Sequence, residues 1–457
     1  MPARVAVIIP AFNLAQYLPA AIDSALAQDV PGGRVEVIVV DDGSTDETSQ
    51  VLDGYTDRVR VIRQENRGLV GAVDRGLAAA DSEYLAILDA DDECPRDRLR
   101  RQAEVLDANP LVGLVHGDME IIDAHGQTIT PSVFRHWQMD VEDGRVLGRL
   151  ISNNFVSGGA SLFRSSLLPA FHPIAPDAAY PDWWIAACIA AVAEITHIDA
   201  ITNRYRFHGA NMGLGAGPER RAEIERRELA WRRWIMRNLV DDDTVTAQHR
   251  HAALNRWMLC VVTAASAEPR GARALLDEDA GAASRVRWAA GGIPDSRALM
   301  REFSRHPFDG ALMADLEVAL LRESSLPEAT PAPPLIALEA RDRLTIGWLE
   351  ELVSCPWMLS AFAARAGQMG DETLAVLAPP GADLAALVAI AEADEQIMDE
   401  RCDITVVSEP ATTPAKALLA ARACARLTRE TSPEPYDSLA VHGAADTSVP
   451  SLASSVF

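Results

Sequence analysis

The sequence predicts an α/β fold: a large domain built on a parallel sheet, a helical segment, and a small C-terminal α/β domain. Three observations predict it. Short β-branched runs alternate with amphipathic stretches over the first 90 residues, which is the pattern of a parallel sheet covered by helices. A shorter alternation of the same kind fills the end of the 457-residue chain. The net charge also divides the chain, into residues 1–218 at −13, residues 219–325 at zero and residues 326–457 at −11.

The first domain, residues 1–218, opens with a regular series of strands and helices. Arg4–Ile9 and Glu36–Val40 are continuous apolar runs, as in strands buried on both faces. Leu14–Gln28 has helical spacing, and Ser44 or Thr45 is the expected N-cap of the next helix. The predicted order is strand 4–9, helix 14–28, strand 36–40, helix 45–52, strand 59–62, helix 69–80 and strand 84–88.

The rest of the chain is predicted from weaker signals. Glu219–Leu239 opens the helical segment 219–325 and interleaves arginines with glutamates around a packing stripe. Two roles suit it: a cover for the first domain, or an interfacial helix at a membrane. Leu326–Pro334 reads as a linker. The third domain, residues 335–457, is expected to be Rossmann-like, with helix 344–369 interrupted at Pro356, strand 373–378, helix 382–393, strand 403–407, helix 415–428 and strand 438–441.

The composition excludes several functional classes. A net charge of −24 argues against nucleic-acid binding and against unaided attraction to anionic lipid. The six cysteines are scattered without a CxxC pair, which predicts reduced core residues and neither a disulfide framework nor a zinc site. The N-terminus lacks the layout of a signal peptide, and the longest uncharged apolar run, Trp183–Ala193, is about half a membrane span. We therefore expect a cytoplasmic protein.

Three of the predicted strands end in polar loops, at residues 10–13, 41–46 and 89–92. The carboxyl ends of parallel strands share one edge of a sheet, where ligands of such folds bind. Helix capping would explain one acidic loop but not two on the same edge. Asp89 and Asp91, two residues apart after a strand, are hard oxygen ligands that suit Mg²⁺ or Mn²⁺. A nucleotide diphosphate bridged by such an ion would fit this edge.

These loops resemble the motifs of family 2 glycosyltransferases, which are inverting enzymes of the GT-A fold (nucleotide-diphospho-sugar transferase, Rossmann-like). The resemblance covers about residues 4–211. It is carried by IPAFN at 9–13, VVDDGSTD at 39–46, NRGL at 66–69, LDADD at 88–92, GGASLFR at 158–164, YPDWW at 180–184 and YRFHGANM at 205–212. One departure stands out: Val73 and Asp74 occupy the positions where the family commonly has Arg-Asn.

The resemblance implies roles for individual residues. Asp182 would be the general base, and Asp91, assisted by Asp89 and His208, would hold Mn²⁺ or Mg²⁺. The donor nucleotide would be bound by Pro10, Ala11, Phe12, Asn13, Asp41, Asp42, Asn66, Arg67, Gly68, Arg75, Asp89, Ala90 and Arg206. Structural alternatives stand beside these roles: a helix N-cap for Asp182, a loop hydrogen bond for His208, an ion pair for Arg206, and core packing for Trp183 and Trp184.

The expected activity is metal-dependent, inverting transfer of a hexose-type sugar from a nucleotide-diphosphate donor, in the first place a UDP-sugar. The acceptor would be a hydroxyl in cell-surface polysaccharide or glycoconjugate biosynthesis. One alternative is a non-catalytic glycan- or protein-binding module on the same fold. Another is a nucleotidyltransferase, which would need a glycine- and lysine-rich phosphate loop, whereas the only lysine is Lys416. The sequence is compatible with peripheral association at the inner face of the membrane and with homo-oligomer formation, and no nucleic-acid partner is expected.

Overall fold

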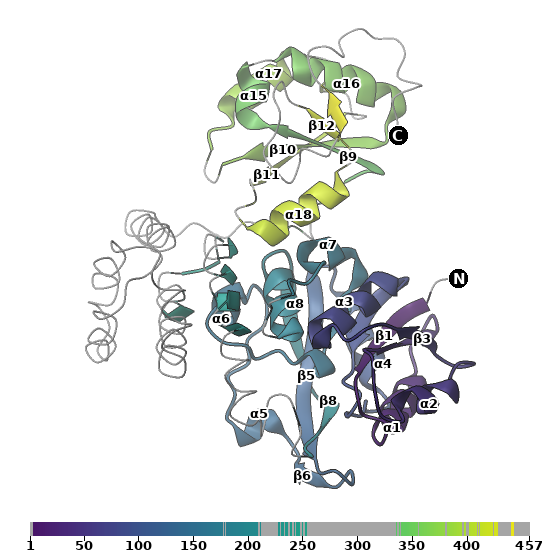
Figure 1. Ribbon diagram of the computed structural model, residues 1–457. Helices are drawn as coiled ribbons and strands as arrows, with labels where there is room; N and C mark the ends of the chain where they lie inside the picture. The colour runs from purple at the N-terminus through teal and green to yellow at the C-terminus, as the bar shows by residue number, and fades with distance from the viewer. Residues whose placement is uncertain are drawn as a thin grey trace, which may run out of the picture. The chain divides into compact units, whose positions relative to one another are not determined.

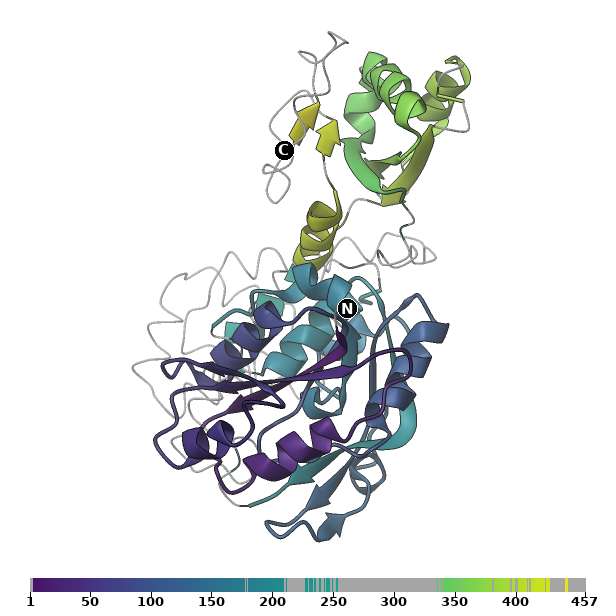
Figure 2. The same ribbon diagram turned by 90° about the vertical axis from the view of Figure 1, so that its right-hand side faces the viewer.

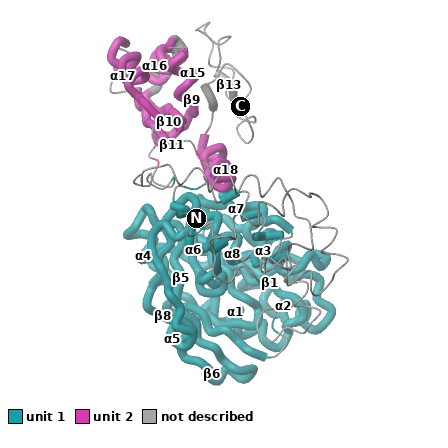
Figure 3. The backbone as a smooth tube through the Cα atoms, turned by 90° about the vertical axis from the view of Figure 1, so that its left-hand side faces the viewer, with its two compact units in different colours: residues 1–336 teal, residues 337–457 magenta. Residues whose placement is uncertain are grey.

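The computed structural model describes residues 3–208 except 177 and 179, scattered positions between 211 and 253, residue 335, most of 338–427, and 440–442. The chain divides into two compact units, Met1–Ile336 and Ala337–Phe457, which are coloured separately in Figure 3. Most of the predicted helical segment 219–325, and the predicted linker before residue 335, lie outside the described residues.

Unit 1 is built on an eight-stranded sheet in the order β3-β2-β1-β4-β7-β5-β6, with β8 paired to β5 (Figure 1). The strands and helices that matter below are β1 (Ala3–Ala11), α1 (Leu18–Leu26), β2 (Val35–Asp41), α2 (Thr48–Asp53), β3 (Arg60–Arg63), α3 (Gly68–Ala79), β4 (Ser82–Ile87), α4 (Arg98–Ala108), β5 (Val112–Ile122), β6 (Thr128–Thr130), α5 (Val133–His136), α6 (Leu147–Leu150), β7 (Leu162–Arg164), α7 (Leu168–Phe171), α8 (Pro181–Ala190) and β8 (Glu194–Arg206).

The α/β class and every element predicted before residue 90 are confirmed, with shifted bounds. The expected capping of α2 was wrong. Its N-cap is Glu47, which makes no side-chain cap, and the N–H of Thr48 donates to Asp46 Oδ1 at 2.9 Å. Ser44 and Thr45 are not free for capping, because both hydrogen-bond to Asn13 across to the neighbouring loop.

The order in which successive strands are added to the sheet reverses at β1: β2 and β3 lie on one side of it and β4 on the other. β1 pairs in parallel with β2 on one side and with β4 on the other, so the carboxyl ends of these three strands share one edge. Such a switch point is where open α/β sheets bind ligands. Figure 2 shows helices on both sides of this sheet. Among them, α3 lies so close to β1 that a Cβ on Gly76 would come within 2.3 Å of Ile8 Cγ2.

Unit 2 is a five-stranded sheet in the order β11-β10-β9-β12-β13, with every pair parallel. Its elements are β9 (Arg343–Trp348), α15 (Leu349–Ser354), α16 (Trp357–Met369), β10 (Glu372–Ala378), α17 (Ala385–Glu392), β11 (Asp403–Ser408), α18 (Thr413–Arg422), β12 (Ala425–Leu427) and β13 (Ala440–His442).

Two helical predictions in unit 2 were wrong. Residues 344–348 were expected to begin a helix but form the central strand β9, and residues 425–427 form strand β12 beyond the end of α18. In both cases tertiary pairing decides, because β9 is hydrogen-bonded to β10 on one side and to β12 on the other. The Rossmann-like alternation itself is confirmed.

The described positions between residues 227 and 253 pack on α8, within unit 1. Trp231, Ile235 and Leu239 are buried, and the ring of Trp234 lies 4.4 Å from that of Trp184 in α8. These positions support the covering role, because their apolar side chains are already enclosed by protein. Among the helices that the structure describes, none is both long and apolar enough to cross a membrane.

Candidate active site

Two polar side chains shape the loops after β1 and β2, and Asn13 joins one loop to the other. Asn13 Oδ1 accepts from the N–H groups of Thr45 at 2.7 Å and Asp46 at 3.3 Å. Asn13 itself has a positive φ of 54°. Asp41 accepts from the Ser44 N–H at 3.0 Å and from Ser49 Oγ at 2.7 Å. Both side chains therefore shape the loops. Phe12 beside them is 44% exposed, which leaves an aromatic face available at this sheet edge.

Asp42 connects the β2 loop to the segment after β3. Its Oδ1 accepts from Gln64 Nε2 and from the Arg67 N–H, both at 2.8 Å. The close approach requires a glycine at position 43, where φ is 74° and a Cβ would lie 2.9 Å from the Asn66 N. The predicted residues from both loops are thus brought together at one edge.

The remaining predicted donor residues are placed around this connection. Asn66 Oδ1 accepts from the Gly68 N–H at 3.2 Å, which turns the chain into α3. Pro10 and Ala11 are buried in the last part of β1, and the Ala11 carbonyl accepts from the Asp42 N–H at 2.9 Å. Arg67 and Arg75 are exposed.

The departure from the family motif at positions 73 and 74 has a structural explanation. Val73 is buried in α3, and Asp74 accepts from the Ile174 N–H at 2.7 Å and lies 3.3 Å from His172 Nε2. Asp74 thereby holds the segment before α8. That segment leads to Asp182, so Asp74 attaches the chain before α8 to α3.

The acidic loop after β4 is held by backbone and side-chain donors of β8. Asp92 is buried and accepts from the Arg206 N–H at 2.8 Å and from Asn203 Nδ2 at 2.7 Å. Burial, together with the charges of Asp89 and Asp91, raises the pKa of Asp92 well above its usual value. Ala90 is buried between the two aspartates.

His208 and Asp91 form the most direct contact at the site. His208 Nε2 lies 2.9 Å from Asp91 Oδ2, and its ring stacks on Tyr17 with centroids 4.8 Å apart. The His208 N–H also donates to Asn211 Oδ1 at 3.0 Å. The imidazole is thus both a loop residue and a partner of the acidic loop.

Arg206 does not point into an open site. Its guanidinium donates to the carbonyls of Asp91 at 2.8 Å and Asp123 at 3.3 Å, and it forms an ion pair with Glu93. Only 5% of its side chain is exposed. This geometry favours the structural ion pair over the diphosphate contact, because the guanidinium N–H groups already bond to these carbonyls and to Glu93.

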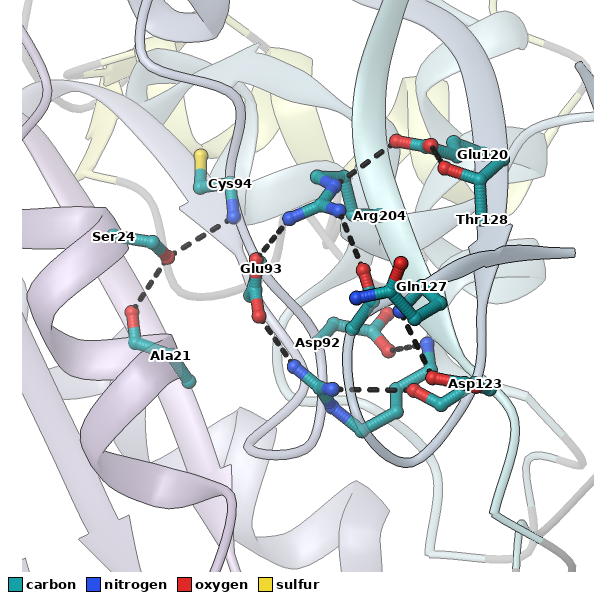
Figure 4. Close-up of polar contacts among 12 residues, drawn as sticks. Ala21, Ser24, Asp92, Glu93, Cys94, Glu120, Asp123, Gln127, Thr128 and Arg204 are labelled. Atoms are coloured by element: carbon teal, nitrogen blue, oxygen red, sulfur yellow. Dashed lines mark hydrogen bonds and ion pairs between the residues drawn. The ribbon is translucent and has the colours of Figure 1, made fainter. Parts of the chain in front are cut away.

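Glu93 links Arg206 to a second arginine of β8. Figure 4 shows Arg204 between Glu93 and Glu120, and its Nε donates to Glu120 Oε2 at 2.9 Å. In the same view the Cys94 N–H donates to Ser24 Oγ at 3.0 Å, which attaches the loop to α1. The acidic loop is therefore fixed from both sides before any ligand binds.

Asp182 lies in the first turn of α8, whose N-cap is Tyr180. Its Oδ1 accepts from the Trp183 N–H at 2.8 Å, and its Oδ2 is 3.4 Å from Asn154 Nδ2. The expected N-cap position was therefore two residues late, but the carboxylate still bonds to the helix start. Burial raises the pKa of Asp182, while hydrogen bonds from Trp183, Gly158 and Asn154 act in the opposite direction.

The negative charges of the loop after β4 and of Asp182 in α8 influence each other. The pKa of Asp89 is raised to about 7, first by burial and then by the negative charges of Asp91 and Asp182, while Arg98 acts to lower it. Asp182 is 93 residues beyond Asp89 in the sequence, yet its carboxylate acts electrostatically on the β4 loop. The fold thus brings the predicted base and the predicted metal loop into one site.

The predicted metal ligands have suitable chemistry for a divalent cation but are only partly brought together. Two aspartates and an imidazole are ligands that Mn²⁺ accepts, and a cation would relieve the carboxylate repulsion that adds to burial in raising the pKa of Asp89. Within the described part of the chain, no three His, Cys, Asp or Glu side chains already converge on one point. Asp91 and His208 instead contact each other.

Several residues around the site were not singled out from the sequence. Tyr17 stacks on His208, Asn154 contacts Asp182, and Asn203 holds Asp92. Asp92 belongs to a recognisable motif and could have been inferred from it. The other three carry no local signal, because their partners are at least 28 residues away in the sequence.

The chain is similar in sequence to known proteins. A family model described as Glycosyl transferase family 2 matches residues 6–170. An uncharacterised glycosyltransferase of Nostoc sp. is 33% identical over 222 residues, which is 47% of this chain and 67% of that protein. The succinoglycan biosynthesis protein ExoO of Rhizobium meliloti is 46% identical over 103 residues, 22% of this chain and 29% of that protein.

A solved structure is similar over a longer stretch at lower identity. The crystal structure of S. aureus TarS 1-349 in complex with UDP-GlcNAc aligns with a TM-score of 0.43 and 18% identity, covering 66% of this chain and 92% of that one. The chain spans two thirds of the Nostoc protein but less than a third of the Rhizobium protein.

Proposed function

Because the chain belongs to glycosyltransferase family 2, we propose that it transfers a sugar from a nucleotide-diphosphate donor, a UDP-sugar in the first place, to an acceptor hydroxyl with inversion. The relative named for succinoglycan biosynthesis suggests a polysaccharide or glycoconjugate as the acceptor. Metal dependence and the pathway are parts of this proposal.

One observation supports the chemistry more than any other. Burial first, and then the charges of Asp91 and Asp182, raise the pKa of Asp89, so the carboxylate at the start of α8 lies near the loop after β4. A transferase needs a donor-side charge centre and an acceptor-side base within one site. This combination of a carboxylate base near an acidic loop is what supports a transferase over a binding module.

The chain's own residues account for the steps of the reaction. Phe12, Asp42 and the loops that Asn13 closes would hold the nucleotide at the ends of β1 and β2. Asp182 would accept the proton of the acceptor hydroxyl as its oxygen forms the bond to the anomeric carbon. The bond from that carbon to the diphosphate breaks in the same step, which inverts the centre. A Mn²⁺ or Mg²⁺ ion held by Asp91, with Asp89 and His208, would neutralise the departing diphosphate.

The first test is a hydrolysis screen over nucleotide sugars with and without Mn²⁺, using Asp91→Ala and the wild-type chain. We expect UDP release from at least one UDP-sugar, and we expect Asp91→Ala to abolish metal-dependent UDP binding while its circular dichroism is unchanged. Asp81→Ala is the matched control, since Asp81 is exposed just before β4. Full turnover by Asp91→Ala in EDTA would overturn the metal assignment.

Asp182→Asn tests the base separately from donor binding. We expect UDP affinity to persist and turnover to fall by about 10²–10⁴-fold, the usual contribution of general-base catalysis. The nearly isosteric amide keeps an oxygen for the Trp183 N–H. Calorimetric titration with UDP and steady-state kinetics measure the two effects. Unchanged turnover would remove Asp182 from the mechanism.

A further inference from the structure

Arg98 is a buried arginine beneath the site. It is the first residue of α4, and it is 1% exposed. Burying a guanidinium is costly unless its donors are paired. Its Nε donates to Gln102 Oε1 at 3.2 Å, and its Nη2 donates to the carbonyls of Ile87 at 3.3 Å and Ser161 at 2.7 Å.

The two carbonyls lie where neighbouring strands separate. β4 and β7 are antiparallel, and the last pair toward the site is Ala86 with Leu162. The next pair along this register would be Ile87 with Ser161. Arg98 Nη2 donates to both of these carbonyls, so the guanidinium joins the two strands at the position where their backbone pairing ends.

Gln102, one turn further along α4, extends this connection. It is fully buried, and its Nε2 donates to the carbonyls of Val115 at 3.1 Å and Ala160 at 2.7 Å. Arg98 and Gln102 thereby join α4 to β4, to β5 and to the segment before β7. The pair forms a buried polar network in which each side chain restricts the other.

The two strand ends that Arg98 bridges lead to the two halves of the site. Ile87 is two residues before Asp89. Ser161 is three residues after Gly158, whose N–H bonds to Asp182. A Cβ on Gly158 would come within 2.9 Å of Asp182 Cβ, so this turn lies directly against the base.

We propose that Arg98 is a positioning residue that sets the separation between the acidic loop after β4 and the turn at residues 158–161, which lies against Asp182. The tether itself follows from the contacts, and its catalytic consequence rests on the proposed transferase function. A planar guanidinium suits this place, because it can serve two carbonyls and an amide from one buried group.

The tether is tested without any activity by amide hydrogen exchange in the full chain. Arg98→Met keeps the length of the side chain and removes its donors. We expect exchange to accelerate in two segments together, residues 88–93 and 158–162. Arg101→Met is the matched control, because Arg101 lies on the same helix, its side chain is 49% exposed, and it pairs only with Asp97 in the described contacts. Acceleration in one segment or in neither would overturn the tether.

The positioning role is tested by kinetics on the folded variants, with the UDP-sugar that the screen selects. For Arg98→Met we expect kcat to fall by at least about tenfold, while KM for the donor changes less than about threefold, because a misplaced base affects the chemical step more than binding. Arg98→Lys should keep the charge and the fold but recover only part of kcat, since an ammonium cannot reproduce the planar fork.

The possible failures are distinguishable. Wild-type kcat in folded Arg98→Met or Arg98→Lys would overturn the positioning role even if exchange changes. If the wild-type chain neither binds UDP nor hydrolyses any nucleotide sugar, the proposed function fails, and the exchange experiment alone decides whether the tether exists. If Arg98→Met does not fold, Arg98→Lys carries both measurements.

Discussion

At the scale of the residue, Asp182 combines two roles in one carboxylate. One oxygen accepts from the helix N–H of Trp183, and the other faces Asn154. A carboxylate that bonds to a helix start keeps a fixed direction, which a general base needs. The structural bond to α8 and the proposed catalytic role are therefore compatible.

The pH dependence of turnover should report this environment. Burial raises the pKa of Asp182 above its usual value, and the Asn154 hydrogen bond lowers it. A base works only when deprotonated, so turnover should fall as the pH drops through this pKa. Asn154→Ala removes a contact that favours the charged form, and the acid limb of kcat should therefore move to higher pH.

The control for this prediction is Asn153→Ala. Asn153 is the exposed neighbour, and no described side-chain contact joins it to Asp182. Its pH profile should coincide with that of the wild-type chain. An acid limb that stays in place in Asn154→Ala, or that moves to lower pH, would contradict the assignment of Asp182 as the titrating base.

At the scale of the element, a cluster of four tryptophans fastens the helical positions after residue 226 to α8. The ring of Trp231 lies 5.0 Å from Trp184 and 6.0 Å from Trp183, and Trp234 stacks on it at 5.3 Å. Trp183 Nε1 also donates to the Leu150 carbonyl at 2.7 Å, which holds α8 to α6. Helix α8, whose first turn carries Asp182, is thus packed against aromatic side chains.

Trp231→Ala should destabilise unit 1 strongly. Trp231 is 2% exposed, and truncating a buried tryptophan to alanine costs about 3–5 kcal/mol, because transfer free energy and packing contacts are both lost. Urea unfolding followed by circular dichroism measures the change. Trp137→Ala is the control, since Trp137 is 49% exposed and should change stability by no more than about 0.5 kcal/mol. Equal effects of the two substitutions would contradict the packing role.

At the scale of the whole molecule, every residue of the candidate site lies in unit 1. Unit 2 has its own parallel sheet and its own core, centred on residues such as Leu359, Phe362 and Leu374. Its role is unassigned. The net charge of −24 also has a partial explanation, because five of the acidic residues, Asp41, Asp42, Asp89, Asp91 and Asp182, shape the site.

Separating the two units should leave donor binding intact. A chain ending at residue 336 keeps every residue of the candidate site, so we expect its Kd for UDP with Mn²⁺ to stay within about threefold of the full chain's. Isothermal titration of both proteins measures this. Loss of UDP binding by a truncated chain that still shows cooperative unfolding would assign unit 2 a part in the site.

Most of the fold could be predicted from local patterns. The strand runs before residue 90 and the loops that follow them stand next to each other in the sequence, and their spacing was sufficient to infer a parallel sheet. In unit 2 the same reasoning failed at β9, because residues 344–348 suit a helix as well as a strand. Pairing with two neighbouring strands, which no local pattern reveals, makes them a strand.

Local patterns in the sequence identify the chemical groups at the ends of the strands, because motif order and alternation are local properties of the chain. Which of these groups act together depends on the folded arrangement. The fold brings the charge of Asp182 close enough to affect the pKa of Asp89, bonds the Arg206 side chain to the backbone of Asp91, and places Arg98 between Ile87 and Ser161. The contacts of Arg98 with Ser161 and of Arg206 with Asp91 join residues 63 and 115 positions apart, so they depend on where the strand order reverses and not on any neighbouring residues.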